Sequence, residues 1–188
     1  MLRSEGAGRV KAEEGAGEPV SDGGTGNGRA YIEGGANSRD GGRDVVRSKT
    51  FDNGIAPSAE HSIVVDACIA PEVKKCLIEN GAYFMNERES EALAEHCFCS
   101  NGSCKKNMVG QSAAALAKRV GIPAGDRVTL LVAERKYVSI SDPYCKGFLA
   151  PVHAFYIEQD WDCLLYTADA ADDPLCVSHG ARPREKKK

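Results

Sequence analysis

The feature that most constrains the fold is an alternation of short apolar runs with amphipathic stretches across residues 62–157. The run SIVVDA at 62–67 is rich in β-branched residues and suits a buried strand. Two further runs of this kind are RVTLLVA at 127–133 and PVHAFYI at 151–157. Buried strands separated by helices predict a parallel sheet covered on both faces, because parallel strands need crossover connections. We therefore expect an α/β fold.

Three amphipathic segments lie between these runs and predict helices. The first begins at Pro71, which fits a first helical turn, and closes at Gly81. The second covers residues 87–98 and the third covers 112–120. Upstream, the glycines of segment 34–42 are expected to interrupt any helix before an apolar pattern resumes at residue 44.

Glycine is concentrated at the start of the chain, where 13 of the 20 glycines fall in residues 1–54. Segment 62–165 carries most of the Ile, Leu, Val, Phe and Tyr. A glycine-rich segment with few apolar residues cannot bury much surface. We expect a packed region from about residue 61 to residue 162, with weakly specified ends.

Charge and cysteine content exclude several classes of function. The formal net charge is −3, which gives no nucleic-acid footprint. No apolar run is long enough to cross a bilayer, and the N-terminus lacks the order of a signal peptide. We expect a cytoplasmic protein whose eight cysteines are free thiols.

Residues 48–62 carry the segment SKTFDNGIAPSAEHS. This segment resembles the nucleophile segment of the CoA-acylating aldehyde dehydrogenases, a family that includes the aldehyde dehydrogenase half of bifunctional aldehyde-alcohol dehydrogenases. In that family KTFDNG is followed by two small or apolar residues and the catalytic cysteine. The corresponding position here is Pro57, which has no thiolate to attack a carbonyl. We expect no intact catalytic residue and an inactive chain.

The resemblance extends through VGQSAAALAKRVGIPAGDRVTLLVAE and LAPVHAFYIEQDWD, and so covers about residues 2–162. It implies an incomplete catalytic domain of the aldehyde dehydrogenase fold. On this basis residues 1–33 are a glycine-rich remnant of the dinucleotide-binding domain and residues 34–162 are the partial catalytic domain. Residues 163–188 have no clean period and end in a lysine run, so we expect a non-native or disordered tail.

The segment GAGRVKAEEGAGEPVSDGGTGNGRAYIE at 6–33 is similar to the family's cofactor segment. Glycines let the backbone approach a phosphate, and a helix beginning near residue 9 would present its N-terminal amides to that anion. Taken without the family, the same residues also fit a flexible glycine-rich tail. Asp22 would stand in a buried strand, which should be weak or lost. The resemblance implies NAD-binding residues Gly6, Ala7, Gly8, Gly24 and Gly26.

Two further positions of the family pattern lack their carboxylates. The glutamate that holds the nicotinamide ribose aligns with Gly147, so the ribose loses a charge-assisted acceptor. The general base of hydrolytic aldehyde dehydrogenases aligns with Gly23, which agrees with an acylating subfamily. The upstream half of a dinucleotide crevice is also absent from the sequence. Even a cysteine at position 57 is therefore expected to leave this chain inactive.

Other candidate site residues have weaker support. Ser58 and His61 are a candidate pair of nucleophile and base. His153 fits a strand residue satisfied by a neighbour better than a catalytic base, and Tyr156 and Trp161 fit core or rim aromatics. A dense set of donors could bind a metal, but its spacing is not that of a zinc knuckle, and we expect no metal. This set consists of His96, Cys97, Cys99 and Cys104.

In the family that the chain resembles, a cysteine thiolate attacks the aldehyde, hydride passes to NAD, and the acyl group passes to CoA. The resemblance thus implies NAD as cofactor, with an aldehyde and CoA as small-molecule partners, and a homo-oligomer in the parent enzyme. Two alternatives stay open. One is another branch of the family with a longer-chain aldehyde. The other is a non-catalytic interaction module, because truncation would expose strand edges.

Overall fold

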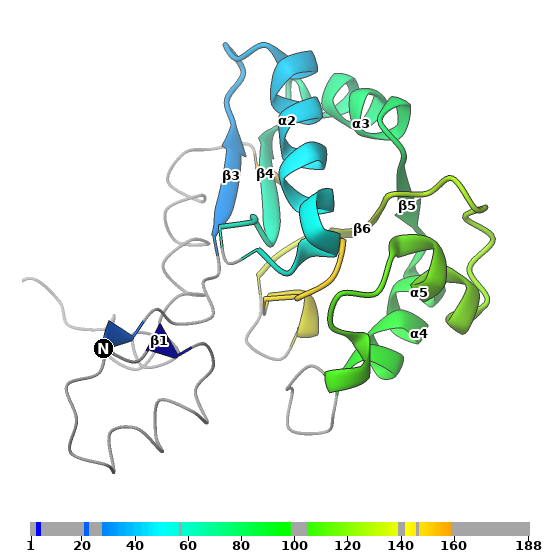
Figure 1. The fold of residues 1–188 in the computed structure, drawn as a ribbon. Coiled ribbons are helices and arrows are strands. Elements are labelled where there is room, and N and C mark those ends of the chain that lie inside the picture. Colours follow the sequence, from blue (N-terminus) through cyan, green and yellow to red (C-terminus); the bar gives the residue numbers. More distant parts are fainter. Residues whose placement is uncertain are drawn as a thin grey trace, which may run out of the picture.

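Five parallel strands form the central sheet, in the order β3-β4-β7-β6-β5 (Figure 1). The computed structural model describes residues 3–4, 21–22, 28–56, 58–98, 105–138, 142–145 and 147–158. Every pairing in this sheet is parallel, which confirms the predicted α/β class. The strands are β3 (Arg29–Ile32), β4 (Ser62–Asp66), β5 (Ala82–Met85), β6 (Leu130–Arg135) and β7 (Val152–Glu158).

One face of the sheet is covered by α2 (Ser38–Thr50) and α3 (Ala70–Glu79), which lie beside each other in Figure 1. Their apolar side chains pack on alternate residues of the strands, and the burial of this apolar surface stabilises the packing of the helices on the sheet. The core on this side consists of Ile32, Val45, Val46, Ile63, Val65, Ala70, Val73, Leu77, Ala82, Leu130, Val132 and Phe155.

The opposite face is covered by α4 (Glu87–Cys97) and α5 (Ala113–Val120). Asn86 and Glu89 form a capping box that fixes the start of α4, and Gly121 ends α5 in a left-handed conformation. Their buried residues include Leu93 and Leu116. Helices on both faces confirm the expectation drawn from the apolar runs.

Helix α2 was not expected to begin where it does. The glycines of segment 34–42 were predicted to interrupt helical structure, and this is wrong from Ser38 onward. The side chain of Asn37 accepts hydrogen bonds from the first amides of the helix and so starts it. Gly42 is buried, and a Cβ atom there would lie 3.0 Å from the Sγ of Cys76 in α3. The glycine thus lets the two helices approach closely.

Shorter elements complete the described fold. Three 3-10 turns cover Phe51–Gly54, Lys106–Met108 and Pro143–Cys145. A separate parallel pair is formed by β1 (Arg3–Ser4) and β2 (Ser21–Asp22), each two residues long. None of the helices in the described ranges has the length and apolarity that crossing a membrane requires.

The division at residues 33 and 162 remains a prediction. Strand β3 falls within residues 1–33 of that division, and it pairs with β4 from Arg29↔Ser62 to Ile32↔Val65. The residues after 158, which include Trp161 and the whole of the expected tail, lie outside the described ranges.

Candidate active site at the amino ends of β4 and β7

Two loops meet at the amino ends of the central strands β4 and β7. The KTFDNG segment ends α2 and leads through residues 55–61 into β4, while residues 147–151 lead into β7. The two strands are parallel neighbours with Ser62 opposite Ala154, so their entry loops lie at the same edge of the sheet. This edge therefore brings together the segments that contain positions 57 and 147, which the resemblance predicts to correspond to the family's nucleophile and ribose-binding glutamate.

The KTFDNG segment makes a left-handed turn. Asp52 and Asn53 have φ values of 49° and 51°, and Gly54 follows with a φ of 76°. Aspartate and asparagine tolerate this region better than other side chains, although each such residue still costs on the order of 1 kcal/mol. The DNG tripeptide is thus suited to this turn, and backbone of this kind is common at functional sites.

Gly54 is required by contact as well as by conformation. A Cβ atom at this position would lie 2.6 Å from the carbonyl oxygen of Ala150 and 3.1 Å from the nitrogen of Pro151. The backbone of the turn therefore packs directly against the loop that enters β7.

Pro57 lies outside the described residues, so its placement remains a prediction from the alignment. Its surroundings are described. The amide of Ala59 donates to the carbonyl of Ala56 at 3.0 Å, which spans position 57. Ser58 is exposed and Ala59 is buried.

A buried polar joint, which we call the clasp, connects the two loops to α2. It consists of the side chains of Lys49 and His61 and the backbone of Phe148. The Nζ of Lys49 lies 3.0 Å from Nδ1 of His61 and donates to the Phe148 carbonyl at 2.9 Å. The Phe148 amide donates to the same Nδ1 at 3.0 Å. Both side chains are almost completely buried, at 0% and 1% exposed.

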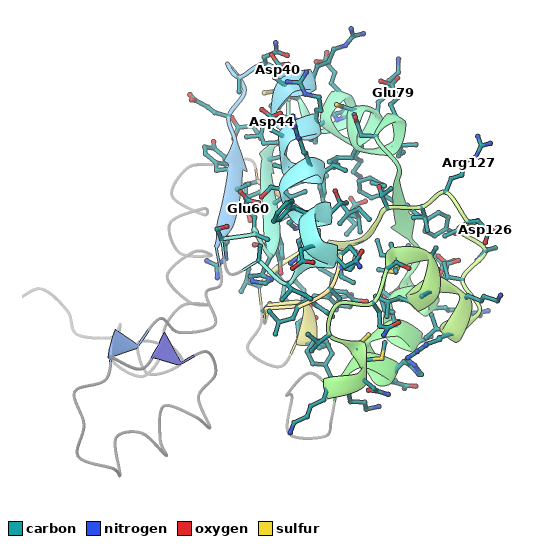
Figure 2. All side chains as sticks on the ribbon, viewed as in Figure 1. Asp40, Asp44, Glu60, Glu79, Asp126 and Arg127 are labelled. Carbon is teal, nitrogen blue, oxygen red and sulfur yellow. The ribbon has the colours of Figure 1, made fainter. Side chains whose placement is uncertain are left out.

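The clasp fixes the protonation of His61. A backbone amide can only donate, so Nδ1 must accept, and the proton of the neutral ring is on Nε2. Burial, followed by the charge of Lys49, lowers the pKa of His61 to about 4. Burial lowers the pKa of Lys49 to about 7, and the Glu60 carboxylate opposes this effect. Glu60, labelled in Figure 2, lies on the segment between α2 and β4.

The hypothetical nucleophile pair of Ser58 and His61 is not assembled. Nδ1 of His61 accepts from Lys49 and Phe148, and Nε2 has no partner in the described part of the chain. The serine is exposed whereas the imidazole is buried. His61 cannot act as the base of Ser58 in this arrangement.

His153 is a strand residue, as expected, and its ring lies beside the backbone of His61. It lies in β7 with 0% exposure, and neither ring nitrogen has a hydrogen-bond partner among the described residues. Burial, followed by the charge of Lys49, lowers its pKa well below the usual value. Tyr156 is a core aromatic, as predicted, at 2% exposed.

The predicted NAD-binding residues Gly6, Ala7, Gly8, Gly24 and Gly26 lie outside the described ranges, as does Gly23. Gly147 is described, half-buried, directly before the clasp residue Phe148. Because glycine has no side chain, position 147 offers no carboxylate for a ribose. Position 147 therefore does not supply the cofactor contact that the resemblance predicts there.

Only part of the candidate metal cluster is described. Cys97 is buried in the core, and His96 is half-buried at the end of α4. Cys99 and Cys104 are not among the described residues. Within the ranges that the structure covers, no group of three or more His, Cys, Asp or Glu is arranged to hold a metal ion.

A pocket of about 740 Å³ lies at the opposite edge of the sheet, at the carboxyl ends of β5 and β6. Three of its charged lining residues form ion pairs. Arg135 contacts Asp142 at 2.6 Å, and Glu134 contacts Lys74 at 2.6 Å. Size alone therefore does not make it the better candidate site. Its lining includes Met85, Glu87, Ser90, Lys136, Tyr137 and Pro143.

Sequence reasoning assigned no role to Lys49, although a signal for its burial was present. Lys49 lies three and four residues after the buried Val46 and Val45, and this spacing places all three on one face of a helix. A lysine on the apolar face of a predicted helix needs a partner inside the protein.

Comparison with known proteins identifies the relatives of this chain. No protein-family model matches it. The aldehyde-alcohol dehydrogenase of Streptococcus pneumoniae is 32% identical over 162 residues, which cover 82% of this chain and 18% of that enzyme.

The fold matches solved structures of the same group. An acetylating aldehyde dehydrogenase from Geobacillus thermoglucosidasius aligns with a TM-score of 0.82 and 34% identity, over 93% of this chain and 38% of its own. Rhodopseudomonas palustris propionaldehyde dehydrogenase with bound propionyl-CoA aligns with a TM-score of 0.80 and 25% identity. This alignment covers 91% of this chain and 38% of the Rhodopseudomonas chain. The chain thus spans well under half the length of its relatives. It is a partial-length homologue of the CoA-acylating aldehyde dehydrogenases.

Proposed function

We propose that this chain derives from an enzyme that converts an aldehyde, CoA and NAD into an acyl-CoA and NADH, and that the chain itself does not catalyse this reaction. In the proposed parent reaction, a thiolate adds to the aldehyde carbonyl, the adduct transfers hydride to NAD, and CoA displaces the acyl group. The required thiolate has no counterpart at Pro57.

The observation that carries the proposal is the meeting of two segments at one sheet edge. The DNG turn packs on Ala150, and the clasp ties the same loop to Phe148. The edge is thus built as a joint between the segments that carry positions 57 and 147, while both positions lack the functional side chain. An intact scaffold with lost chemical groups fits a non-catalytic homologue.

A short aldehyde such as acetaldehyde is the proposed substrate of the parent enzyme, with NAD and CoA. The acetylating aldehyde dehydrogenase and the propionyl-CoA complex among the structural neighbours support this choice. A longer-chain aldehyde is the alternative within the family. We further propose a cytoplasmic, homo-oligomeric parent.

A second candidate function is an interaction module. β3 and β5 are the edge strands of the five-stranded sheet, and Phe51 beside the DNG turn is 70% exposed. Edge strands and exposed aromatic side chains favour association. Light scattering of the purified chain tests this function, and a defined oligomer without turnover would support it.

The turnover test uses acetaldehyde, CoA and NAD with the unmodified chain, followed by NADH absorbance and detection of acetyl-CoA. We expect neither product, because the chain offers no thiolate at the nucleophile position. Sustained formation of both products by the unmodified chain would contradict the proposal.

A further inference from the structure

The clasp uses both backbone polar groups of Phe148. Its amide donates to His61, and its carbonyl accepts from Lys49, at 3.0 and 2.9 Å. Lys49 belongs to the last turn of α2, His61 directly precedes β4, and Phe148 directly follows position 147. Three separate segments therefore converge on a single buried point.

We propose that Lys49 and His61 are positioning residues that hold the described residues of segments 51–61 and 147–151 together and thereby set the geometry of the candidate site at the amino ends of β4 and β7. The assignment of that site rests on the function proposed above. The mechanical coupling of the two segments does not depend on it.

A second contact between the two segments fixes the orientation of the β7 entry loop. The DNG turn touches the β7 entry loop where Gly54 packs on Ala150, two residues beyond Phe148. A single point of attachment would leave the loop free to pivot. The clasp and the glycine contact together fix its orientation as well as its distance.

The charge arrangement indicates a local role for the clasp. Lys49 is buried without a carboxylate within ion-pair distance in the described chain, and the neighbouring groups that affect it are Glu60, His61 and His153. Replacing buried charged groups by apolar ones of similar volume often leaves global stability unchanged or improved. The hydrogen bonds of the clasp are directional, however, and an apolar side chain cannot hold Phe148 in place.

Hydrogen exchange measured by mass spectrometry on the intact chain tests this proposal. We expect Lys49→Met and His61→Leu to accelerate exchange in segments 51–61 and 147–151 together, by about tenfold, with β6 unchanged. His61→Asn should retain protection, because its amide oxygen can accept from both Lys49 and Phe148. His153→Leu is the matched control: it removes an equally buried imidazole beside the His61 backbone that makes no hydrogen bond with Lys49 Nζ or the Phe148 backbone, and both segments should stay protected.

Three outcomes would overturn the proposal. The first is that Lys49→Met changes exchange only within α2. The second is that His61→Asn behaves as His61→Leu does, and the third is that His153→Leu loosens both segments equally. If a variant fails to fold, nitrogen NMR of the unmodified chain decides. An unprotonated Nδ1 on His61 at neutral pH supports the clasp, whereas a protonated Nδ1 refutes it. None of these measurements requires turnover, so they can refute the positioning role of the clasp without bearing on the proposed function.

Discussion

At the scale of single residues, three basic side chains share one buried region. Lys49, His61 and His153 are 0%, 1% and 0% exposed, and the two histidines precede paired residues of β4 and β7. Burial disfavours the charged form of each group, and the charge of Lys49 adds to this effect on both histidines. At the edge that carries the candidate site, the protonation of three buried groups is therefore coupled to folding.

Stability is expected to rise with pH in two windows, because the unfolded chain binds more protons there than the folded chain does. The pKa of His61 falls from 6.5 to about 4, so stability should be lost as pH falls through that range. The pKa of Lys49 falls from 10.5 to about 7, so stability should increase above pH 7. The second effect amounts to as much as about 4 kcal/mol between pH 7 and 10.

Urea unfolding across these windows measures both effects. Lys49→Met should remove the rise in the free energy of unfolding above pH 7. His61→Asn should reduce the loss of unfolding free energy below pH 6.5. His153 still contributes to that loss in the variant, because its pKa is also lowered. A Lys49→Met profile that still follows the unmodified chain above pH 7 would show that Lys49 is not the group responsible.

Gly54 allows the contact between the two loops to be tested separately from backbone strain. Gly54 and Gly125 both have a φ of 76°, but a Cβ atom at 125 would meet nothing within 4 Å. Each alanine substitution should cost about 1 kcal/mol for the left-handed conformation. Gly54→Ala should cost roughly 2 kcal/mol more, because its Cβ would lie 2.6 Å from the Ala150 carbonyl oxygen. Equal losses in urea unfolding would mean that the loop contact is readily relaxed.

At the scale of elements, α2 connects the fold to the candidate site. One face of the helix packs on the sheet through Val45 and Val46, and its last turn supplies Lys49. The opposite face carries exposed charges, of which Asp40 and Asp44 are labelled in Figure 2. The position of α2 thus sets where Lys49 reaches the two loops.

Alanine substitutions at the two adjacent glycines of α2 are expected to change the stability of the chain differently. At Gly41 the new Cβ would make ordinary contacts with Ile32 at 3.5 Å, so the variant should gain about 0.5–1 kcal/mol of helix propensity. At Gly42 it would lie 3.0 Å from the Sγ of Cys76, and crowding against α3 should cancel or reverse the gain. Thermal unfolding of the pair tests this, and stabilisation by Gly42→Ala would argue against close packing of α2 on α3.

The sequence predicted the long periodic elements better than the short or glycine-containing ones. Strands β4, β6 and β7 have strong apolar runs, and their pairing confirms the expected parallel sheet. β5, with four residues between Gly81 and Asn86, is too short for a reliable period. α2 was missed at its start because propensity counts glycines as breakers, whereas packing against Cys76 favours glycine there.

The site was only partly predictable, for a related reason. The KTFDNG motif located the loop, and the alignment of the family's ribose-binding glutamate with Gly147 located the facing segment, because both depend on local spacing in the sequence. The clasp depends on three segments that are brought together by the sheet, so no local pattern could predict its hydrogen bonds. Only the apolar spacing around Lys49 indicated that its side chain turns inward.

At the scale of the whole molecule, the chain covers only part of the enzymes that it resembles. It spans 18% of the Streptococcus pneumoniae aldehyde-alcohol dehydrogenase and 38% of the Geobacillus thermoglucosidasius enzyme. Within this portion the sheet is covered on both faces and has two well-packed cores. The scaffold around the candidate site is therefore retained, while positions 57 and 147, which the resemblance assigns to the nucleophile and the ribose-binding glutamate, carry proline and glycine.

Covalent acyl transfer tests the central claim most directly, because it requires the nucleophile but not hydride transfer. The unmodified chain and its Pro57→Cys variant are incubated with acetyl-CoA, and acetylated peptides are mapped by mass spectrometry. The proposed function predicts a thioester at position 57 in the variant alone, without sustained NADH production from acetaldehyde in either protein. An acyl adduct on the unmodified chain that forms and decays during steady NADH production would contradict it.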